Sequence, residues 1–169
     1  MFMSSVLRSA RRPRVLSCAA VLLCFAIQQG AMSQSPPAPS PAKRAVDERK
    51  AIFTLIGANF RPIGEQLQGR ASLSDADARK RAERVAFLAV LSSEAFSDVS
   101  NVGDPGTRAK PEIWSRRAEF DKSVAEFVKR AQTLSQVVAT QGTGSAAFKA
   151  AAGAVGESCK ACHDDYRSK

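Results

Sequence analysis

Residues 145–167 read SAAFKAAAGAVGESCKACHDDYR, and this stretch indicates both a fold class and a candidate site. Its apolar residues recur at alternating spacings of four and three, which is the repeat of one face of an α-helix. They are Phe148, Ala152, Val155, Cys159, Cys162 and Tyr166. The stretch therefore predicts a helix whose buried stripe includes both cysteines.

Three further segments carry helical patterns, so four helices are expected over 46–68, 75–96, 111–140 and 145–167. The third repeats the spacing with Phe120, Val124, Phe127, Ala131, Leu134 and Val138. The first repeats it with Arg49, Phe53, Ile56, Phe60, Ile63 and Leu67. The second is less regular, and its expected inward residues are Val85, Leu88 and Leu91. Such stripes interdigitate in near-parallel packing, so the fold class is all-α, an antiparallel four-helix bundle.

Turn and capping residues mark the limits of these helices. Ser74 with Asp77 resembles a capping box, and Pro111 suits a first helical turn. Gly69, Gly142 and Gly144 mark the ends of other helices. The longest connection between helices is expected over 97–110. Pro62 should kink the first helix or loosen one of its hydrogen bonds.

The pentapeptide Cys159-Lys160-Ala161-Cys162-His163 has the form of a c-type haem attachment signature. Two thiols three residues apart lie on one helix face, where they can bond the two vinyl groups of one porphyrin. The adjacent imidazole then reaches the iron. We expect one haem c per chain, covalently bound through two thioethers, with the metal held by His163.

The histidines and methionines of the chain restrict which ligand can occupy the other axial position of the iron. His163 is the only histidine, and the three methionines are Met1, Met3 and Met32, all in the expected leader. No second His or Met is left to complete the usual coordination. The iron is therefore expected to have five ligands, with an empty or weakly occupied sixth position.

Three other uses of the pair Cys159 and Cys162 are open to the sequence. In an oxidising compartment they could form a disulfide, although His163 has no role in one. A structural zinc site would lack its fourth ligand. A thioredoxin-like redox motif would need a preceding strand, and no strand is readable before it.

The N-terminal region is typical of an exported protein. Residues 1–33 carry four arginines and no acid, an apolar run over 15–27 and a small-residue stretch, which predicts a cleaved signal peptide and a periplasmic location. The pair Arg11-Arg12 allows a twin-arginine route, but haem attachment to an unfolded chain favours general secretion. Residues 34–44 hold four prolines and should be an extended linker, which leaves 45–169 as one domain.

The formal net charge of +9 overstates the processed chain. Removing residues 1–33 leaves 21 basic and 16 acidic residues, a net charge of +5. Solvated helix faces account for most of this charge, while the run Arg79-Lys80-Arg81 could steer an anionic partner. A nucleic-acid partner is not expected, and the apolar run of the leader is too short to span a membrane permanently.

Arg49 interrupts the apolar stripe of the first expected helix. One interpretation is a helix-end residue whose head group reaches water, and the other is a partner for a haem propionate. Lys50 is a second candidate for the propionate contact.

Taken together, the sequence resembles the cytochrome c′ family of class II c-type cytochromes. The resemblance rests on residues 159–167, on Arg49 and the apolar run after it, and on Lys-Pro-Glu-Ile-Trp at 110–114. Cytochromes c′ are standard examples of four-helix bundles. The resemblance implies thioethers at Cys159 and Cys162 and proximal ligation by His163. It also implies Arg167 beside the imidazole, Arg49 near a propionate, and Phe53 over the vacant distal face, where Leu is often found.

These features predict a non-enzymatic haem protein that binds nitric oxide and carbon monoxide. The resemblance implies a five-coordinate high-spin iron and a homodimer. An apolar distal wall of Phe53, Ile56 and Phe60 offers bound dioxygen no hydrogen bond, which favours nitric oxide scavenging or sensing. The alternative is electron transfer with a periplasmic redox protein, and weak catalysis is a third interpretation that lacks an evident acid or base. Ile52 and Leu55 form a second apolar strip that suits a dimer contact or the second helix.

Overall fold

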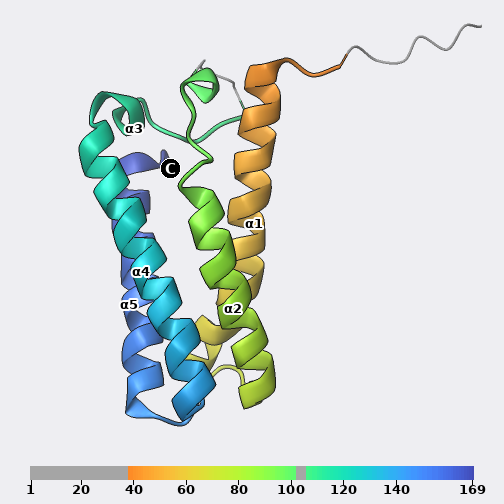
Figure 1. Cartoon of the computed structure of the whole chain (residues 1–169), viewed down its shortest axis with the longest axis vertical. Helices are drawn as coiled ribbons and strands as arrows, with labels where there is room; N and C mark the ends of the chain where they lie inside the picture. The colour runs from red at the N-terminus through yellow and green to blue at the C-terminus, as the bar shows by residue number, and fades with distance from the viewer. Residues whose placement is uncertain (1–37, 102–105) are drawn as a thin grey trace, which may run out of the picture. The chain divides into compact units, whose positions relative to one another are not determined.

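The computed structural model describes residues 38–101 and 106–169, and all six of its elements are helical (Figure 1). They are α1 Pro41–Leu67, α2 Asp75–Ser92, the 3₁₀ helix η1 Asp98–Ser100, α3 Glu112–Ser115, α4 Arg117–Gln141 and α5 Ala146–Tyr166. The predicted signal peptide over 1–33 and linker residues 34–37 lie outside the described residues.

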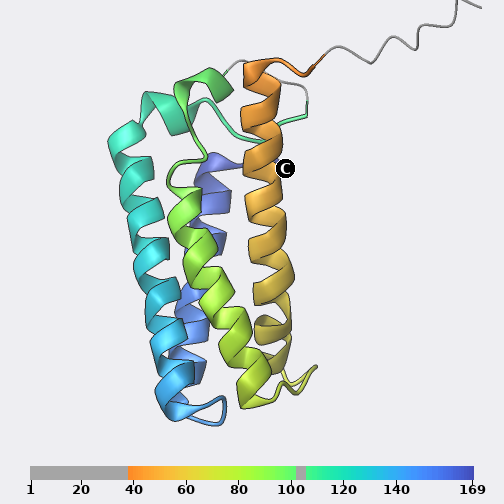
Figure 2. The same cartoon turned by 45° about the vertical axis from the view of Figure 1, so that its right-hand side comes forward.

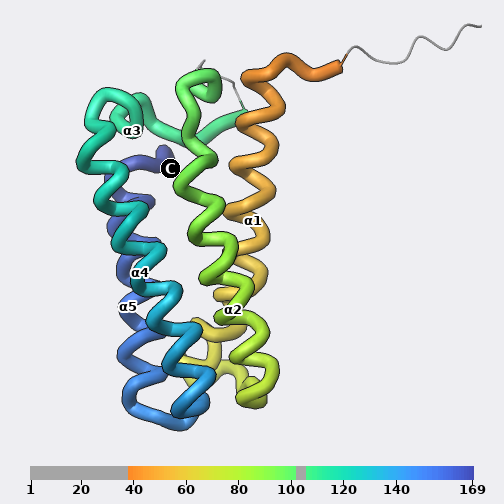
Figure 3. The backbone as a smooth tube through the Cα atoms, in the orientation of Figure 1, coloured from red at the N-terminus to blue at the C-terminus, as the bar shows by residue number. Residues whose placement is uncertain are grey.

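The four long helices form an antiparallel bundle, as predicted. In Figures 1 and 2, α1 and α4 run away from the end that holds η1 and α3, and α2 and α5 return to it. We call this the connection end, and the opposite end, with the turns over 68–74 and 142–145, the turn end; both are easily followed in Figure 3. The α2 helix packs on α1 and α4, and α4 packs on α5, whereas α1 and α5 meet less extensively.

Among residues 38–101 and 106–169, no helix is long and apolar enough to cross a membrane.

The predicted stripe of the third segment is confirmed in full. All six of its residues, from Phe120 to Val138, are buried. In α5, Phe148, Ala152, Val155 and Tyr166 are buried while the two cysteines are partly exposed. In α1, three stripe residues are buried and three are half-buried. Alternating spacing thus located the inward faces of three helices.

The prediction for α2 was wrong in part. Val85 is buried, but Leu88 and Leu91 are only partly so. The buried stripe instead has small residues at the same alternating spacing: Ala78, Ala82, Val85, Ala89 and Ser92. Because interaxial distance depends on the side chains at the contact, these small residues allow α2 to approach both α1 and α4 closely.

Three differences from the predicted helices are more than a one-residue shift of a helix end. The α1 helix begins at Pro41, where the Ser40 hydroxyl accepts a hydrogen bond from the Lys43 amide (3.2 Å), so residues 41–44 are helical rather than extended linker. The α2 helix ends at Ser92 instead of Phe96. The third predicted helix is interrupted at Arg116, whose non-helical backbone separates α3 from α4.

Pro62 lies inside α1, and the helix continues through it to Leu67. Proline has no amide hydrogen, so the carbonyl of Ala58, four residues earlier, loses its helical donor. The Arg81 guanidinium of α2 donates to that carbonyl at 3.3 Å. The loosened bond that the sequence predicted is therefore replaced by a contact between helices.

Candidate functional site

A cavity of about 580 Å³ lies toward the connection end between α1 and α5, which meet less extensively than the other neighbouring pairs of long helices. The main contributors to its wall are α1 and the last turns of α5, with further residues from α4, from the end of α2 and from the connection between α2 and α4. This volume is in the range of cofactor and ligand pockets. All seven residues predicted for the site line it: Arg49, Lys50, Phe53, Cys159, Cys162, His163 and Arg167.

The motif Cys159 to His163 occupies the penultimate and last turns of α5. Both thiols are free and partly buried, and both reach the cavity wall. Within residues 38–101 and 106–169 no group of three or more His, Cys, Asp or Glu side chains is arranged to hold a metal ion. No β-strand precedes the motif in this described part of the chain.

Burial controls the ionisation of these groups. It raises the pKa of Cys159, and it raises the pKa of Cys162 to about 11, with smaller contributions from Cys159 and Asp165. Burial also lowers the pKa of His163, helped by the positive charges of Arg167 and Arg108 and opposed by Asp164. At neutral pH the thiols are therefore protonated and the imidazole is neutral, the form in which histidine binds a metal.

Arg49 is only 4% exposed, so the interpretation that its head group reaches water is wrong. It lies two turns inside α1 because that helix begins at Pro41. Its guanidinium donates to the Ser100 hydroxyl at 3.0 Å and to the Thr107 hydroxyl at 2.7 Å. It also lies 5.0 Å from the ring centroid of Phe96 and 5.9 Å from that of Trp114. These contacts hold a buried positive charge at the cavity wall.

Aromatic and aliphatic side chains form the interior of the cavity. The Phe53 ring meets Phe96 edge-on with a centroid separation of 5.8 Å, and Phe96 meets Phe120 at 4.7 Å. Phe120 in turn contacts Tyr166 at 5.1 Å. Ile56 and Phe60 complete the α1 side, so all three residues predicted for the apolar distal wall line the cavity.

The charged residues of the lining are all positive. Arg49, Lys50, Arg61, Arg108 and Arg167 line the cavity, and no aspartate or glutamate does. Arg61 and Arg108 were not singled out from the sequence, because each lies among ordinary surface charges along the chain. Only the fold brings them to the cavity.

A short strap over 108–110 fixes the end of α5 beside the cavity. Ala109 and Arg167 form an isolated antiparallel bridge, and the Lys110 amide donates to the Tyr166 carbonyl at 3.0 Å. The Lys110 ammonium donates to the carbonyls of Asp164 and Asp165, both at 3.0 Å, where a cation complements the negative end of the helix dipole. No local sequence pattern indicated this pairing.

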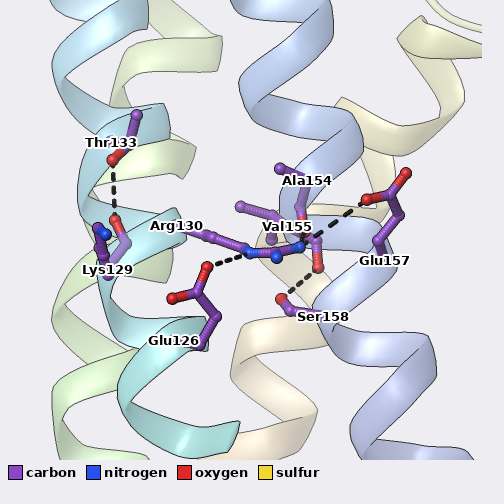
Figure 4. Close-up of polar contacts among 8 residues, drawn as sticks. All are labelled: Glu126, Lys129, Arg130, Thr133, Ala154, Val155, Glu157 and Ser158. Carbon is purple, nitrogen blue, oxygen red and sulfur yellow. Dashed lines mark hydrogen bonds and ion pairs between the residues drawn. The ribbon is translucent and has the colours of Figure 1, made fainter.

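Arg130 fixes α4 against α5 just before the cysteine motif (Figure 4). Its guanidinium donates to the Ala154 carbonyl of α5 at 2.9 Å and pairs with Glu126 at 2.7 Å on its own helix. A longer ion pair reaches Glu157 at 3.8 Å. These contacts lie about one turn ahead of Cys159 and set the position of α5 along α4.

A covalently attached haem fits this set of residues. The wall presents two free thiols on one helix face, with an adjacent imidazole whose pKa is lowered by desolvation and by nearby positive charges. The aromatic interior suits a porphyrin ring, and the uniformly positive charges suit its two carboxylates. A second hollow, of about 640 Å³ between α2 and α4 at the turn end, has neither Cys nor His in its lining.

Comparison with known proteins gives a consistent match. Residues 44–167 match the family model described as Cytochrome C′. A cytochrome c′ of Rubrivivax gelatinosus is 36% identical over 129 residues, which cover 74% of this chain and 95% of that protein. Cytochrome c prime of Shewanella frigidimarina superposes with a TM-score of 0.70 at 32% identity, covering 78% of this chain and all of that one. A nitric oxide complex of a mutant cytochrome c prime of Alcaligenes xylosoxidans gives a TM-score of 0.67 at 32% identity, covering 76% and 97%.

Proposed function

Because the chain belongs to the cytochrome c′ family, we propose that it carries one haem c and binds nitric oxide and carbon monoxide. The observation that carries the proposal is the cavity with Cys159, Cys162 and His163 on one wall and apolar side chains on another. His163 is the only histidine in the whole sequence, and no methionine occurs after Met32. The chain therefore supplies one strong axial ligand and no second one.

In this proposal a bound haem would supply an iron to which a diatomic gas can bind. Cys159 and Cys162 would hold the group through thioethers, and the imidazole of His163 would ligate its iron. Arg49, already buried and held by Ser100 and Thr107, would neutralise a propionate, with Lys50 as a second contact. Arg167 lies beside the proximal imidazole.

The α1 side of the cavity determines which gases suit the site. Phe53, Ile56 and Phe60 exclude water there and offer no hydrogen-bond donor to a bound ligand. Bound dioxygen gains from such a donor more than nitric oxide or carbon monoxide does. The site therefore favours nitric oxide and carbon monoxide over dioxygen. Because the same wall offers no acid or base, we expect the site to bind these gases without catalysing their conversion. We infer that the protein's biological role is nitric oxide scavenging or sensing.

The predicted signal peptide over residues 1–33 supports a periplasmic location for this activity. In that compartment we expect the two thiols to bond to the haem and not to form a disulfide with each other.

The optical spectrum of the purified haem protein tests the proposal. High-spin ferric and ferrous bands, with rapid binding of nitric oxide and carbon monoxide, are expected. Low-spin bands in both oxidation states would show a sixth protein ligand and exclude the proposal. His163→Ala should keep the covalent haem but change the spin state and the gas affinity; an unchanged spectrum would exclude His163 as the ligand.

A homodimer is also part of the proposal, supported by apolar side chains on the outer faces of α1 and α2. Leu55 is 51% exposed and Phe87 is 66% exposed, although both are large and apolar. Sedimentation of the haem-loaded protein should give the mass of two chains. Leu55→Lys and Phe87→Lys should shift it to the mass of one, and a monomeric wild type would refute this part.

A further inference from the structure

Four of the five cations that line the cavity are exposed to solvent, and we call the part of the lining that they form the mouth of the cavity. Lys50 and Arg61 come from α1, Arg108 from the connection before α3, and Arg167 from the residue after α5. Each is exposed to solvent while its side chain also lines the cavity. The mouth is therefore a charged surface as well as an entrance.

The four charges come from two parts of the fold, α1 and the strap beside the end of α5. Lys50 and Arg61 are eleven residues apart, close to three full helical turns, so they project from the same face of α1 about 16 Å apart. At the end of α5, the bridge between Ala109 and Arg167 and the bond from the Ser168 amide to the Arg108 carbonyl (2.9 Å) bring the other two together. A surface of this width is larger than one small anion needs.

The positive charge exceeds what the proposed cofactor requires. With Arg49 the lining holds five cations and no acid, whereas a haem brings two carboxylates. With Arg49 and Lys50 assigned to the two carboxylates, the charges of Arg61, Arg108 and Arg167 remain at the mouth. In the run Arg79-Lys80-Arg81, which the sequence suggested for steering a partner, the charge of Arg79 is paired with Glu83 at 2.9 Å. Arg81 and, at the mouth, Arg108 each donate to a backbone carbonyl, those of Ala58 and Ser168, which does not neutralise their charges.

From this excess we propose that the mouth framed by Lys50, Arg61, Arg108 and Arg167 docks an acidic electron-donor protein. Opposite charges on two proteins raise their rate of association, and they favour a partner whose surface charge has the complementary sign. The inference rests on the proposed function, since a gas-binding ferrous iron must receive one electron from a donor, with no atom transferred. The surface lies where a donor comes nearest to the cavity.

Titration of the haem protein with oxidised flavodoxin, an acidic redox protein, tests the docking without any electron transfer. Binding should weaken as salt rises, and amide NMR shifts should cluster at 50–61, 108–110 and 163–168. Arg61→Glu should weaken binding about tenfold at low salt and little at high salt, because exposed charges are screened there. Lys149→Glu is the matched control, since Lys149 is exposed on α5 at the turn end and the change in net charge is identical.

Equal weakening by both variants would show that net charge alone acts, and would overturn the proposal. Shifts clustered elsewhere, or binding that is insensitive to salt, would overturn it as well. If Arg61→Glu weakens the binding of a small anionic complex such as iron–EDTA but not the binding of flavodoxin, the mouth attracts small anions and the docking proposal fails. Carbon monoxide binding by the wild-type haem protein tests the proposed function separately. A protein that binds carbon monoxide but not flavodoxin refutes the docking alone, and one that binds flavodoxin but not carbon monoxide refutes the proposed function.

Discussion

The two ends of the bundle differ in what their side chains do. At the turn end, Ile63, Leu134 and Ala82 are fully buried, and Asp75 accepts hydrogen bonds from the Thr143 amide (2.8 Å) and hydroxyl (2.6 Å) across the turns. At the connection end a cavity of about 580 Å³ separates α1 from α5, with a buried cation in its wall. At the turn end the interior of the bundle is filled, because the 640 Å³ hollow there is lined mostly by exposed residues and lies at the surface. At the connection end the interior itself keeps room for a cofactor.

The largest expected effect comes from the cysteines at the connection end. Replacing Cys159 and Cys162 together by Ser should abolish covalent haem attachment, because no other thiol lies in the described domain. Absorbance of the chain on a denaturing gel, where non-covalent haem is lost, measures this. Each single variant should retain one thioether, and haem that survives denaturation in the double variant would refute the assignment.

A matched pair of truncations separates stability from ligand access. Leu134→Ala, in the fully packed region, should lower the free energy of unfolding by about 2–5 kcal/mol and leave the carbon monoxide binding rate unchanged. Phe53→Ala, at the half-buried cavity wall, should cost less stability and speed that binding severalfold. Denaturant unfolding and flash photolysis measure the two quantities, and an unchanged rate in Phe53→Ala would place its ring away from the bound gas.

Arg49 tests whether the connection end is held by polar contacts. Arg49→Ala removes the guanidinium donor from the Ser100 hydroxyl and from the Thr107 hydroxyl, which keeps only its bond from the Ala109 amide, so the free energy of unfolding should fall by about 1–3 kcal/mol. Arg49→Lys keeps the charge but lacks the forked donor and should recover only part of the loss. Thermal unfolding of the three proteins checks the order, and equal stability of all three would contradict the role given to these contacts.

The smallest effect is expected from Asp75 at the turn end. Hydrogen bonds from the Thr143 side chain and backbone hold the pKa of Asp75 below its ordinary value of 3.8. A folded-state pKa below the unfolded one stabilises the fold above about pH 4, and this contribution is lost as pH falls through the folded-state value. Asp75→Asn should therefore flatten the acid limb of stability against pH. Parallel curves for both proteins, measured by denaturant unfolding, would exclude the effect.

The sequence was informative wherever one stripe of large side chains pointed inward. The residues of α4 from Phe120 to Val138 were placed correctly, since large apolar residues at alternating spacing seldom lie on a solvated helix face. The α2 stripe was missed because alanine is common on buried and exposed helix faces alike. The start of α1 was missed because Pro41 suggested a linker, although proline is also favoured in a first helical turn.

The candidate site was predictable in its chemistry and less so in its surroundings. The motif from Cys159 to His163 consists of consecutive residues, so it can be recognised from the sequence alone. The pairing of the strap at 108–110 with residues 164–168, and the arrival of Arg61 and Arg108 at the cavity, depend on contacts between distant segments. The sequence left two interpretations of Arg49, and its burial depends on the early start of α1 and on the connection that covers it.

The intact mass of the chain, recovered from a host that exports it and attaches haem, tests the central claim most directly. The account predicts one species heavier than the processed polypeptide by a single haem, and the same mass after denaturation. A bare polypeptide mass, or one lighter by two hydrogens as a Cys159–Cys162 disulfide requires, would contradict it.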